Sequence, residues 1–288
     1  MSPTQPTRGR PRSALVVGGA IALVVLAVLA VGLPRLLGGG GEGSLPAAAT
    51  ESERAARQPA SEAAELPASP EPAFTVARPE PLRRTRDVSR WASVLREVPA
   101  RTAPAEESRV VASLARTTAE GTTNIVLVLD RDEDAAGRLW IRVRVPALPN
   151  GQTGWVPRTA LGGYGLVRTR LLVDRRRLTA TLFRGGRKVF EAPVGIGREA
   201  WPTPPGDFYI RNKLKSYDDP FYGPLAFGTS ARSAVLTDWP AGGFVGIHGT
   251  NQPELVPGRI SHGCIRLKNP DILRLGRLMP VGTPLTVL

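Results

Sequence analysis

The stretch FVGIHGTNQPELVPGRISHGCIR, residues 244–266, decides how the rest of the chain is interpreted. Both histidines and the only cysteine of the 288-residue chain, His248, His262 and Cys264, fall here within seventeen consecutive residues. A thiol with a pKa of about 8.5 is mostly protonated at neutral pH, and a nearby imidazole can take its proton and stabilise the thiolate. The crowding of these side chains predicts a cysteine nucleophile with a histidine base.

Two neighbouring residues fit the same chemistry. Gly263 lets backbone come close to a substrate, and consecutive N–H groups at a tight turn can hold an oxyanion. Arg266 offers a forked donor that suits a carboxylate. Each residue also has a purely structural interpretation: Cys264 as a small buried hydrophobe, His262 as a packed strand residue and Arg266 as a solvated charge.

Other kinds of site are disfavoured. Zinc sites need ligand pairs such as C-x-x-C or H-E-x-x-H, and neither spacing occurs. The letters GIGREA at residues 195–200 fit a dinucleotide fingerprint, but Pro202, Pro204 and Pro205 follow where a helix would have to begin. The net charge of +13 attracts anionic partners. Without a zinc-finger, RNP or basic-zipper spacing, nucleic acid is not an expected partner.

The N-terminus predicts a membrane anchor. Residues 14–33 contain no charge, and twenty residues at about 1.5 Å each span a hydrocarbon core of about 30 Å. Arg8, Arg10 and Arg12 precede the span, so residues 1–13 should stay cytoplasmic. A cleavable signal peptide is the competing interpretation, with an apolar region of only about 7–15 residues. We expect an uncleaved, single-pass transmembrane helix.

A linker and two strand-rich modules follow. Residues 34–90 are rich in Pro, Ala and Glu, a composition that buries too little apolar surface to fold. Residues 91–164 alternate short apolar runs with turns, and Val110–Leu114, Asn124–Leu129 and Leu139–Val145 are the predicted strands. In the last of these, Ile141, Val143 and Val145 alternate with Arg142 and Arg144, which predicts one buried and one solvated face.

Residues 165–288 form the second predicted module. Strands are expected at Arg177–Phe183 and Lys188–Val194, joined by a turn at Gly185-Gly186. One short helix is expected to begin at Asn269-Pro270-Asp271, with these residues as its cap and first turn.

Each module resembles a known family. The first, from VPARTAPAEESRVVASL through GRLWIRVRVP to GQTGWVPRTAL, resembles a bacterial SH3-like domain, a fold that binds cell-wall peptides in some proteins and serves as a spacer in others. The second resembles the L,D-transpeptidase (YkuD) family. That resemblance rests on IHGTN and SHGCIR, on TPPGDF at Thr203–Phe208, on Tyr222–Pro224 and on the closing strand Gly282–Leu288.

These resemblances imply a mainly β chain. It would have an SH3-like small barrel, then a YkuD-type β-sandwich catalytic domain with one or two short helices, after the N-terminal transmembrane helix. The family's roles make Cys264 the nucleophile and His248 the base, with the backbone carbonyl of Gly249 orienting the imidazole. N–H groups around His262, Gly263 and Cys264 would form the oxyanion hole.

The resemblance also implies a substrate and a reaction. Arg266 would meet a substrate carboxylate, and Tyr222 would lie near the cleft. Cys264 would attack the carbonyl before D-Ala in a peptidoglycan stem tetrapeptide, release D-Ala, and pass the acyl group to an amine on a neighbouring stem. No metal or cofactor is implied. The enzyme would act on the wall side of a bacterial cytoplasmic membrane.

Three alternatives remain open at this point. Water as acceptor would make the protein an L,D-carboxypeptidase, and a protein amine would make it an attachment enzyme. A non-catalytic wall-binding protein is the alternative outside enzymology, and a damaged Cys–His–Gly set would favour it.

Overall fold

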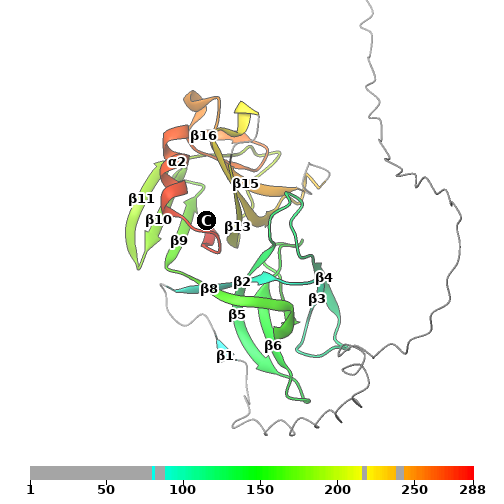
Figure 1. Cartoon of the computed structure of the whole chain (residues 1–288). Coiled ribbons are helices and arrows are strands. Elements are labelled where there is room, and N and C mark those ends of the chain that lie inside the picture. Colours follow the sequence, from blue (N-terminus) through cyan, green and yellow to red (C-terminus); the bar gives the residue numbers. More distant parts are fainter. Residues whose placement is uncertain (1–79, 82–87, 216–218, 238–242) are drawn as a thin grey trace, which may run out of the picture. The chain divides into compact units, whose positions relative to one another are not determined.

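The computed structural model describes residues 80–81, 88–215, 219–237 and 243–288. These residues are mainly β, arranged as two sheets with one α-helix (Figure 1). Within them no helix has the length and apolar character needed to cross a membrane. The anchor predicted at residues 14–33 and most of the linker predicted at residues 34–90 lie outside the described residues.

The first sheet is antiparallel. Its strands are β1 (Glu80–Pro81), β2 (Ser89–Val94), β3 (Val98–Arg101), β4 (Val110–Leu114), β5 (Ile125–Glu133), β6 (Leu139–Arg144), β7 (Thr153–Pro157) and β8 (Leu161–Val167). They lie in the order β4-β3-β7-β6-β5-β2-β8, with β1 paired to β5.

The three strands predicted in this module are confirmed as β4, β5 and β6, with shifts of a few residues at the ends of the last two. The predicted alternation in β6 is also confirmed, since Ile141 and Val143 are buried and Arg142 is exposed. The linker prediction is wrong at its end, because β2 begins at Ser89 and pairs with both β5 and β8. The SH3-like identity of this module stays a prediction.

Strand β5 is buried on both faces. Successive side chains of a strand point to opposite faces, so its uninterrupted apolar run IVLVL supplies two cores. Val126 and Val128 join the core of the first sheet. Ile125 and Leu127 pack on the other face in a cluster with Tyr209, which belongs to the second sheet. The two sheets therefore share an apolar contact through β5.

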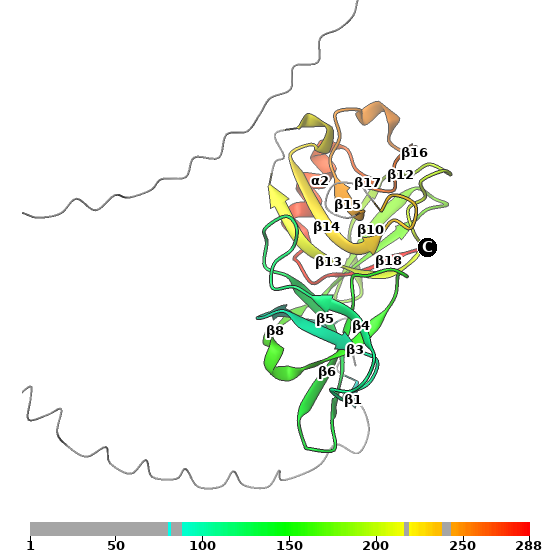
Figure 2. The same cartoon turned by 90° about the vertical axis from the view of Figure 1, so that its right-hand side faces the viewer.

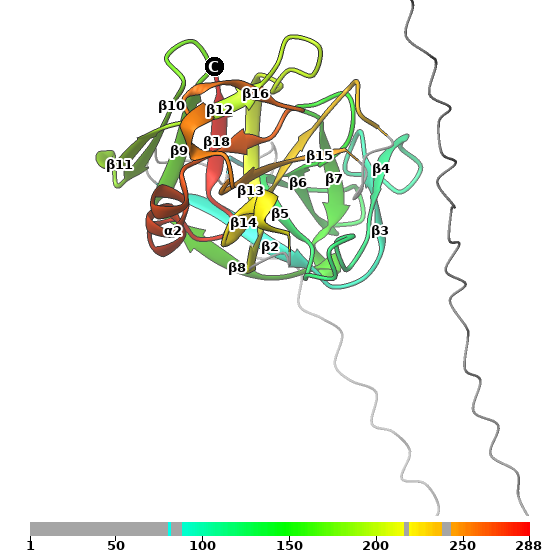
Figure 3. The ribbon, with the colours of Figure 1, turned by 90° about the horizontal axis from the view of Figure 1, so that it is seen from above.

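The second sheet is mixed. Its strands are β9 (Thr169–Asp174), β10 (Thr179–Arg184), β11 (Arg187–Pro193), β12 (Gly195–Gly197), β13 (Gly206–Lys215), β14 (Leu225–Arg232), β15 (Phe244–His248), β16 (Gly258–Ser261), β17 (Ile265–Arg266) and β18 (Pro284–Val287). They lie in the order β11-β10-β9-β18-β13-β14-β15-β17-β12-β16, and β9–β11 gather at one end beside β18 (Figure 3). The pairs β9–β18, β15–β17 and β12–β16 are parallel.

The second module contains the predicted hairpin turn and the predicted helix. The hairpin turn is confirmed, with positive φ at Gly185 and Gly186. The dinucleotide letters begin in a strand, β12, and no helix starts there. Helix α2 (Asn269–Leu278) is confirmed and packs against β14 (Figure 2). Asn269 is not its N-cap, however, because its side-chain oxygen instead accepts the backbone N–H of Thr250 at 2.9 Å.

Candidate active site

Cys264 lies at the end of a tight turn between β16 and β17. The φ of Gly263 is +114°, a backbone conformation that glycine adopts readily. The buried hydroxyl of Ser261 donates to the carbonyl of Cys264 at 2.5 Å and accepts the N–H of Gly263 at 3.1 Å. From the other side, the hydroxyl of Thr203 donates to the carbonyl of Gly263 at 2.7 Å. Two buried hydroxyls therefore fix the backbone that carries the thiol.

His248 is the last residue of β15 and is 2% exposed. Its Nδ1 lies 2.6 Å from the carbonyl oxygen of Gly249. Since a carbonyl can only accept, Nδ1 carries the proton and Nε2 is left as the basic nitrogen. The Tyr222 ring meets the imidazole edge-on, with centroids 4.9 Å apart. The Gly249 contact is the one that the predicted orienting role requires.

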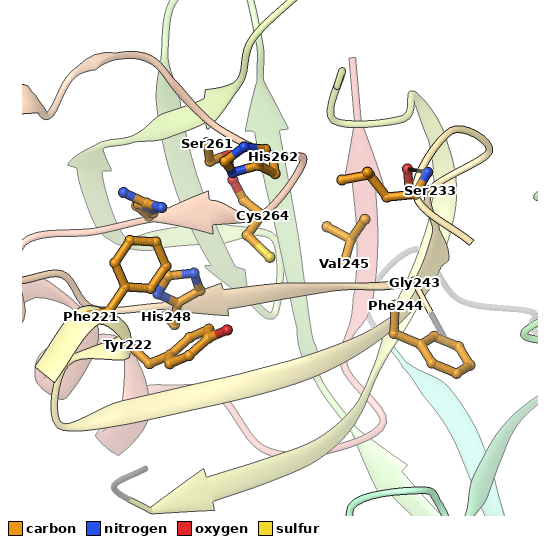
Figure 4. Close-up of a pocket in the computed structure, with 12 residues that line it drawn as sticks. Phe221, Tyr222, Ser233, Gly243, Phe244, Val245, His248, Ser261, His262 and Cys264 are labelled. Carbon is orange, nitrogen blue, oxygen red and sulfur yellow. Dashed lines mark hydrogen bonds between the residues drawn. The ribbon is translucent and has the colours of Figure 1, made fainter. Parts of the chain in front are cut away.

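The thiol and the imidazole share one small space above Gly246. The N–H of Gly246 donates to the Cys264 sulfur at 3.4 Å. A methyl group placed on Gly246 would lie 3.8 Å from both that sulfur and Cδ2 of His248. Strand β15 ends at His248 and pairs in parallel with β17, which begins directly after Cys264, so both residues line the same pocket (Figure 4).

Burial sets the protonation of the pair. It lowers the pKa of His248 from 6.5 to about 4, with Arg266 acting in the same direction. Burial raises the pKa of the Cys264 thiol, against the smaller opposing effects of the Gly246 N–H and Arg266. At pH 7 both groups are neutral, so the thiolate forms only as the proton moves to the imidazole.

Arg266 lines the same pocket and is 4% exposed. Its guanidinium carbon lies 4.1 Å from the centre of the Phe221 ring, in a cation–π contact. Its Nε has no hydrogen-bond partner among the described residues. Desolvation lowers the pKa of Arg266, yet an arginine stays charged at neutral pH. A buried cation of this kind favours an anionic group in the pocket.

The predicted side chains of Tyr222, His248, His262, Cys264 and Arg266 all line one pocket. The pocket is lined by Phe221, Tyr222, Ser233, Leu236, Gly243, Phe244, Val245, His248, Ser261, His262, Cys264 and Arg266. The N–H of Gly263 donates to the hydroxyl of Ser261 at 3.1 Å, and the oxyanion role of the N–H groups around His262, Gly263 and Cys264 stays a prediction. His262 is exposed and stacks on Trp201, with ring centroids 4.4 Å apart.

Sequence reasoning missed Ser261, Thr203 and Phe221. Ser261 and Thr203 stand inside motifs that carry the family resemblance, but their hydrogen bonds to the turn depend on the folded chain. No cluster of three or more potential metal ligands occurs in the described ranges. What the arrangement can do chemically is nucleophilic attack by a thiol with an oriented imidazole as base.

Comparison with known proteins adds a similarity for the second module. Residues 168–287 match the family model of the YkuD L,D-transpeptidase catalytic domain. That match covers less than half of the chain, and the similarity to this catalytic domain is confined to these residues.

Individual relatives match part of the chain. The putative L,D-transpeptidase YkuD of Bacillus subtilis is 33% identical over 109 residues, which is 38% of this chain and 59% of the relative. Its counterpart in Bacillus licheniformis is 31% identical over 118 residues, 41% of this chain and 64% of the relative. The chain thus spans about three fifths of the curated relatives' length. The solved catalytic domain of the E. faecium L,D-transpeptidase is 28% identical and aligns with 42% of this chain and 96% of its own, at a TM-score of 0.31.

Proposed function

We propose that this protein is a peptidoglycan L,D-transpeptidase with Cys264 as nucleophile and His248 as base. The observation that carries the proposal is the 2.6 Å contact between Nδ1 of His248 and the carbonyl of Gly249. It fixes the tautomer whose free nitrogen, Nε2, accepts a proton in the pocket that also holds the thiol.

The acylation half follows from the neutral pair. As sulfur attacks the carbonyl that precedes D-Ala in a stem tetrapeptide, Nε2 of His248 takes the thiol proton. The backbone N–H groups of His262 and Cys264 stabilise the oxyanion, with Gly263 shaping the turn. The imidazolium then protonates the nitrogen of D-Ala, the C–N bond breaks, and a thioester remains on Cys264.

The transfer half reverses these roles. An amine on a neighbouring stem attacks the thioester, and His248 takes its proton. The C–S bond breaks, the proton returns to sulfur, and an amide cross-link is the product. Arg266 binds a carboxylate of the stem, which its burial and its unpartnered Nε support. Tyr222, against the imidazole, lies next to the bound stem.

The full-length protein and its Cys264→Ala variant, incubated with a purified disaccharide-tetrapeptide, test the proposal. Mass spectrometry should show a dimer with the mass of two monomers less one D-Ala, and only with the unchanged protein. A monomer shortened by D-Ala would assign a carboxypeptidase instead. Absence of both, with retained binding to isolated cell wall, would favour the wall-binding alternative.

A second part of the proposal concerns location. The apolar run at residues 14–33 supports a single-pass anchor in a bacterial cytoplasmic membrane. Arg8, Arg10 and Arg12 account for only three of the +13 net charge, so the chain after the anchor is also basic, which supports its attraction to an anionic wall. Protease treatment of intact protoplasts is expected to degrade the region after the anchor. Protection of that region from protease would contradict this topology.

A further inference from the structure

We propose that the first β-module positions one wall of the pocket, with Asn150 as the positioning residue. The inference rests on the proposed function, because that wall belongs to the pocket of Cys264. Asn150 lies in the turn between β6 and β7 and is 82 residues from its partner, Arg232. Its side-chain amide donates to the carbonyl of Arg232 at 2.7 Å and accepts the N–H of the same residue at 3.0 Å. One side chain thus holds both backbone groups of Arg232.

Arg232 leads directly into the pocket wall. It is the last residue of β14, and the next residue, Ser233, lines the pocket and donates its N–H to the carbonyl of Gly243 at 2.8 Å. The hydroxyl of Ser233 in turn accepts the N–H of Leu236 at 3.0 Å. A shift of Arg232 would therefore move a hydrogen-bonded set of wall residues.

A second contact holds the opposite strand of this wall. Phe244 lines the pocket and contacts two guanidinium groups. The centre of its ring lies 3.9 Å from the guanidinium carbon of Arg211 and 4.9 Å from that of Arg232. Arg211 is buried and forms an ion pair at 3.9 Å with Glu120, which belongs to the first module. Both strands of the wall are thus tied, directly or through one arginine, to the first module.

The other wall of the pocket is held differently. Figure 4 shows Ser233 and Phe244 on one side of Cys264, with Phe221, Tyr222 and His248 on the other side. The contacts of His248 with Gly249, Tyr222 and Phe221 lie within the second module. The first module accordingly acts on substrate fit at one wall and leaves the Cys–His pair itself unchanged.

Asn150→Ala in the full-length protein tests the inference, with Ser108→Ala as the matched control. Ser108 also bonds backbone through its side chain, but only within its own loop of the first module. We expect the amide hydrogen of Arg232 to exchange about tenfold faster in Asn150→Ala, since two hydrogen bonds are lost. Asn150→Asp keeps the acceptor and should restore part of the protection at Arg232.

The functional readout separates positioning from stability. We expect Asn150→Ala to raise the KM for the tetrapeptide about fivefold to tenfold with kcat changed less than about twofold, and Ser108→Ala to change neither. Unchanged exchange at Arg232, or equal KM values in the two variants, would overturn the inference.

A third readout does not depend on turnover. Alkylation of Cys264 by a bulky maleimide is expected to become several-fold faster in Asn150→Ala only. If the unchanged protein fails to release D-Ala, the proposed function fails, while the exchange and alkylation results still decide whether Asn150 holds the wall. Equal alkylation rates in the two variants would count against it.

Discussion

The two β-modules are built from similar strands but bury different side chains. In the described residues, the first module buries three polar or charged side chains and the second buries thirteen. The thirteen include His248, Ser261, Thr203 and Arg266, which surround Cys264 or fix its turn. Buried polar groups cost stability unless they are hydrogen-bonded. The larger number of buried polar side chains in the second module therefore indicates that this module holds the functional site.

The largest effect is expected at Cys264, the proposed nucleophile. Cys264→Ala should reduce D-Ala release by at least about 10³-fold, because no thioester can form. The melting temperature should stay within a few degrees, since a small half-buried side chain is removed. In the first module, Asn124→Ala removes a buried side-chain bond to the carbonyl of Ala115 and should lower stability with little change in turnover by the folded fraction. A Cys264→Ala variant that still released D-Ala would remove the distinction between the modules.

The next effect concerns the turn that carries the thiol. Ser261→Ala deletes the bonds to the Cys264 carbonyl and the Gly263 N–H, so kcat should fall by about 10²-fold through misplacement of the sulfur. Ser108→Ala deletes comparable bonds in the first module and should leave kcat within about twofold. Steady-state kinetics of both variants decide the matter. Equal losses would mean that hydroxyl–backbone bonds matter for folding alone.

These hydroxyl bonds also show where sequence reasoning ends. The Cys–His pair is predictable, because chemistry demands a thiol and an imidazole and the chain has only one cysteine. Strands with clear alternation, such as β6, are predictable for the same kind of local reason. The bond between Thr203 and Gly263 joins residues 60 positions apart, and no local pattern encodes it.

Two contacts show how tertiary structure decides the partner of a polar group. The position of Gly263 in a tight turn predicts an N–H available as a donor, and in the folded chain this N–H donates to the hydroxyl of Ser261. Asn269 has the residue type of an N-cap, yet its side chain bonds the backbone of Thr250, which approaches only in the folded chain. Residue type thus predicts the capacity for a bond, and tertiary structure selects the partner.

An effect of intermediate size is expected in the pH dependence of kcat/KM. The pKa of His248 is lowered from 6.5 to about 4, so the base stays neutral to about pH 4. At pH 5 an ordinary histidine would be protonated enough to lower the rate about 30-fold, whereas here kcat/KM should change little. A pH–rate profile with its acid limb near 6.5 would contradict this assignment.

The same shift has a consequence for stability. The unfolded state binds a proton on His248 below pH 6.5 and the folded state only below about 4. The stability of the second module is therefore expected to decrease as pH falls from 6.5 to 4 and not to change further through this group.

The first module has no histidine. Its Asp134 has a pKa lowered to about 2 by bonds from Trp140 and Arg138, so the contribution of Asp134 is lost only below pH 3.8.

The smallest expected effect is on the free energy of unfolding, and it tests whether the two modules unfold together. Tyr209 of β13 is fully buried, and its hydroxyl donates to the carbonyl of Ile125 in β5 at 3.0 Å. Tyr209→Phe leaves that carbonyl unsatisfied and should lower the free energy of unfolding by about 1–2 kcal/mol. The matched control is Tyr164→Phe, at an exposed ring of the first module. This substitution should change the free energy of unfolding by less than about 0.5 kcal/mol.

Two probes make this small shift informative. Trp140 and Trp155 report on the first module, and Trp201 on the second. Variants that keep tryptophan in only one module allow denaturant unfolding to be followed there by fluorescence. If the shared cluster around Tyr209 couples the sheets, Tyr209→Phe shifts both midpoints equally. A shift confined to one module would mean that the sheets unfold separately, and the wall held by Asn150 would then depend on a contact that opens before the catalytic domain does.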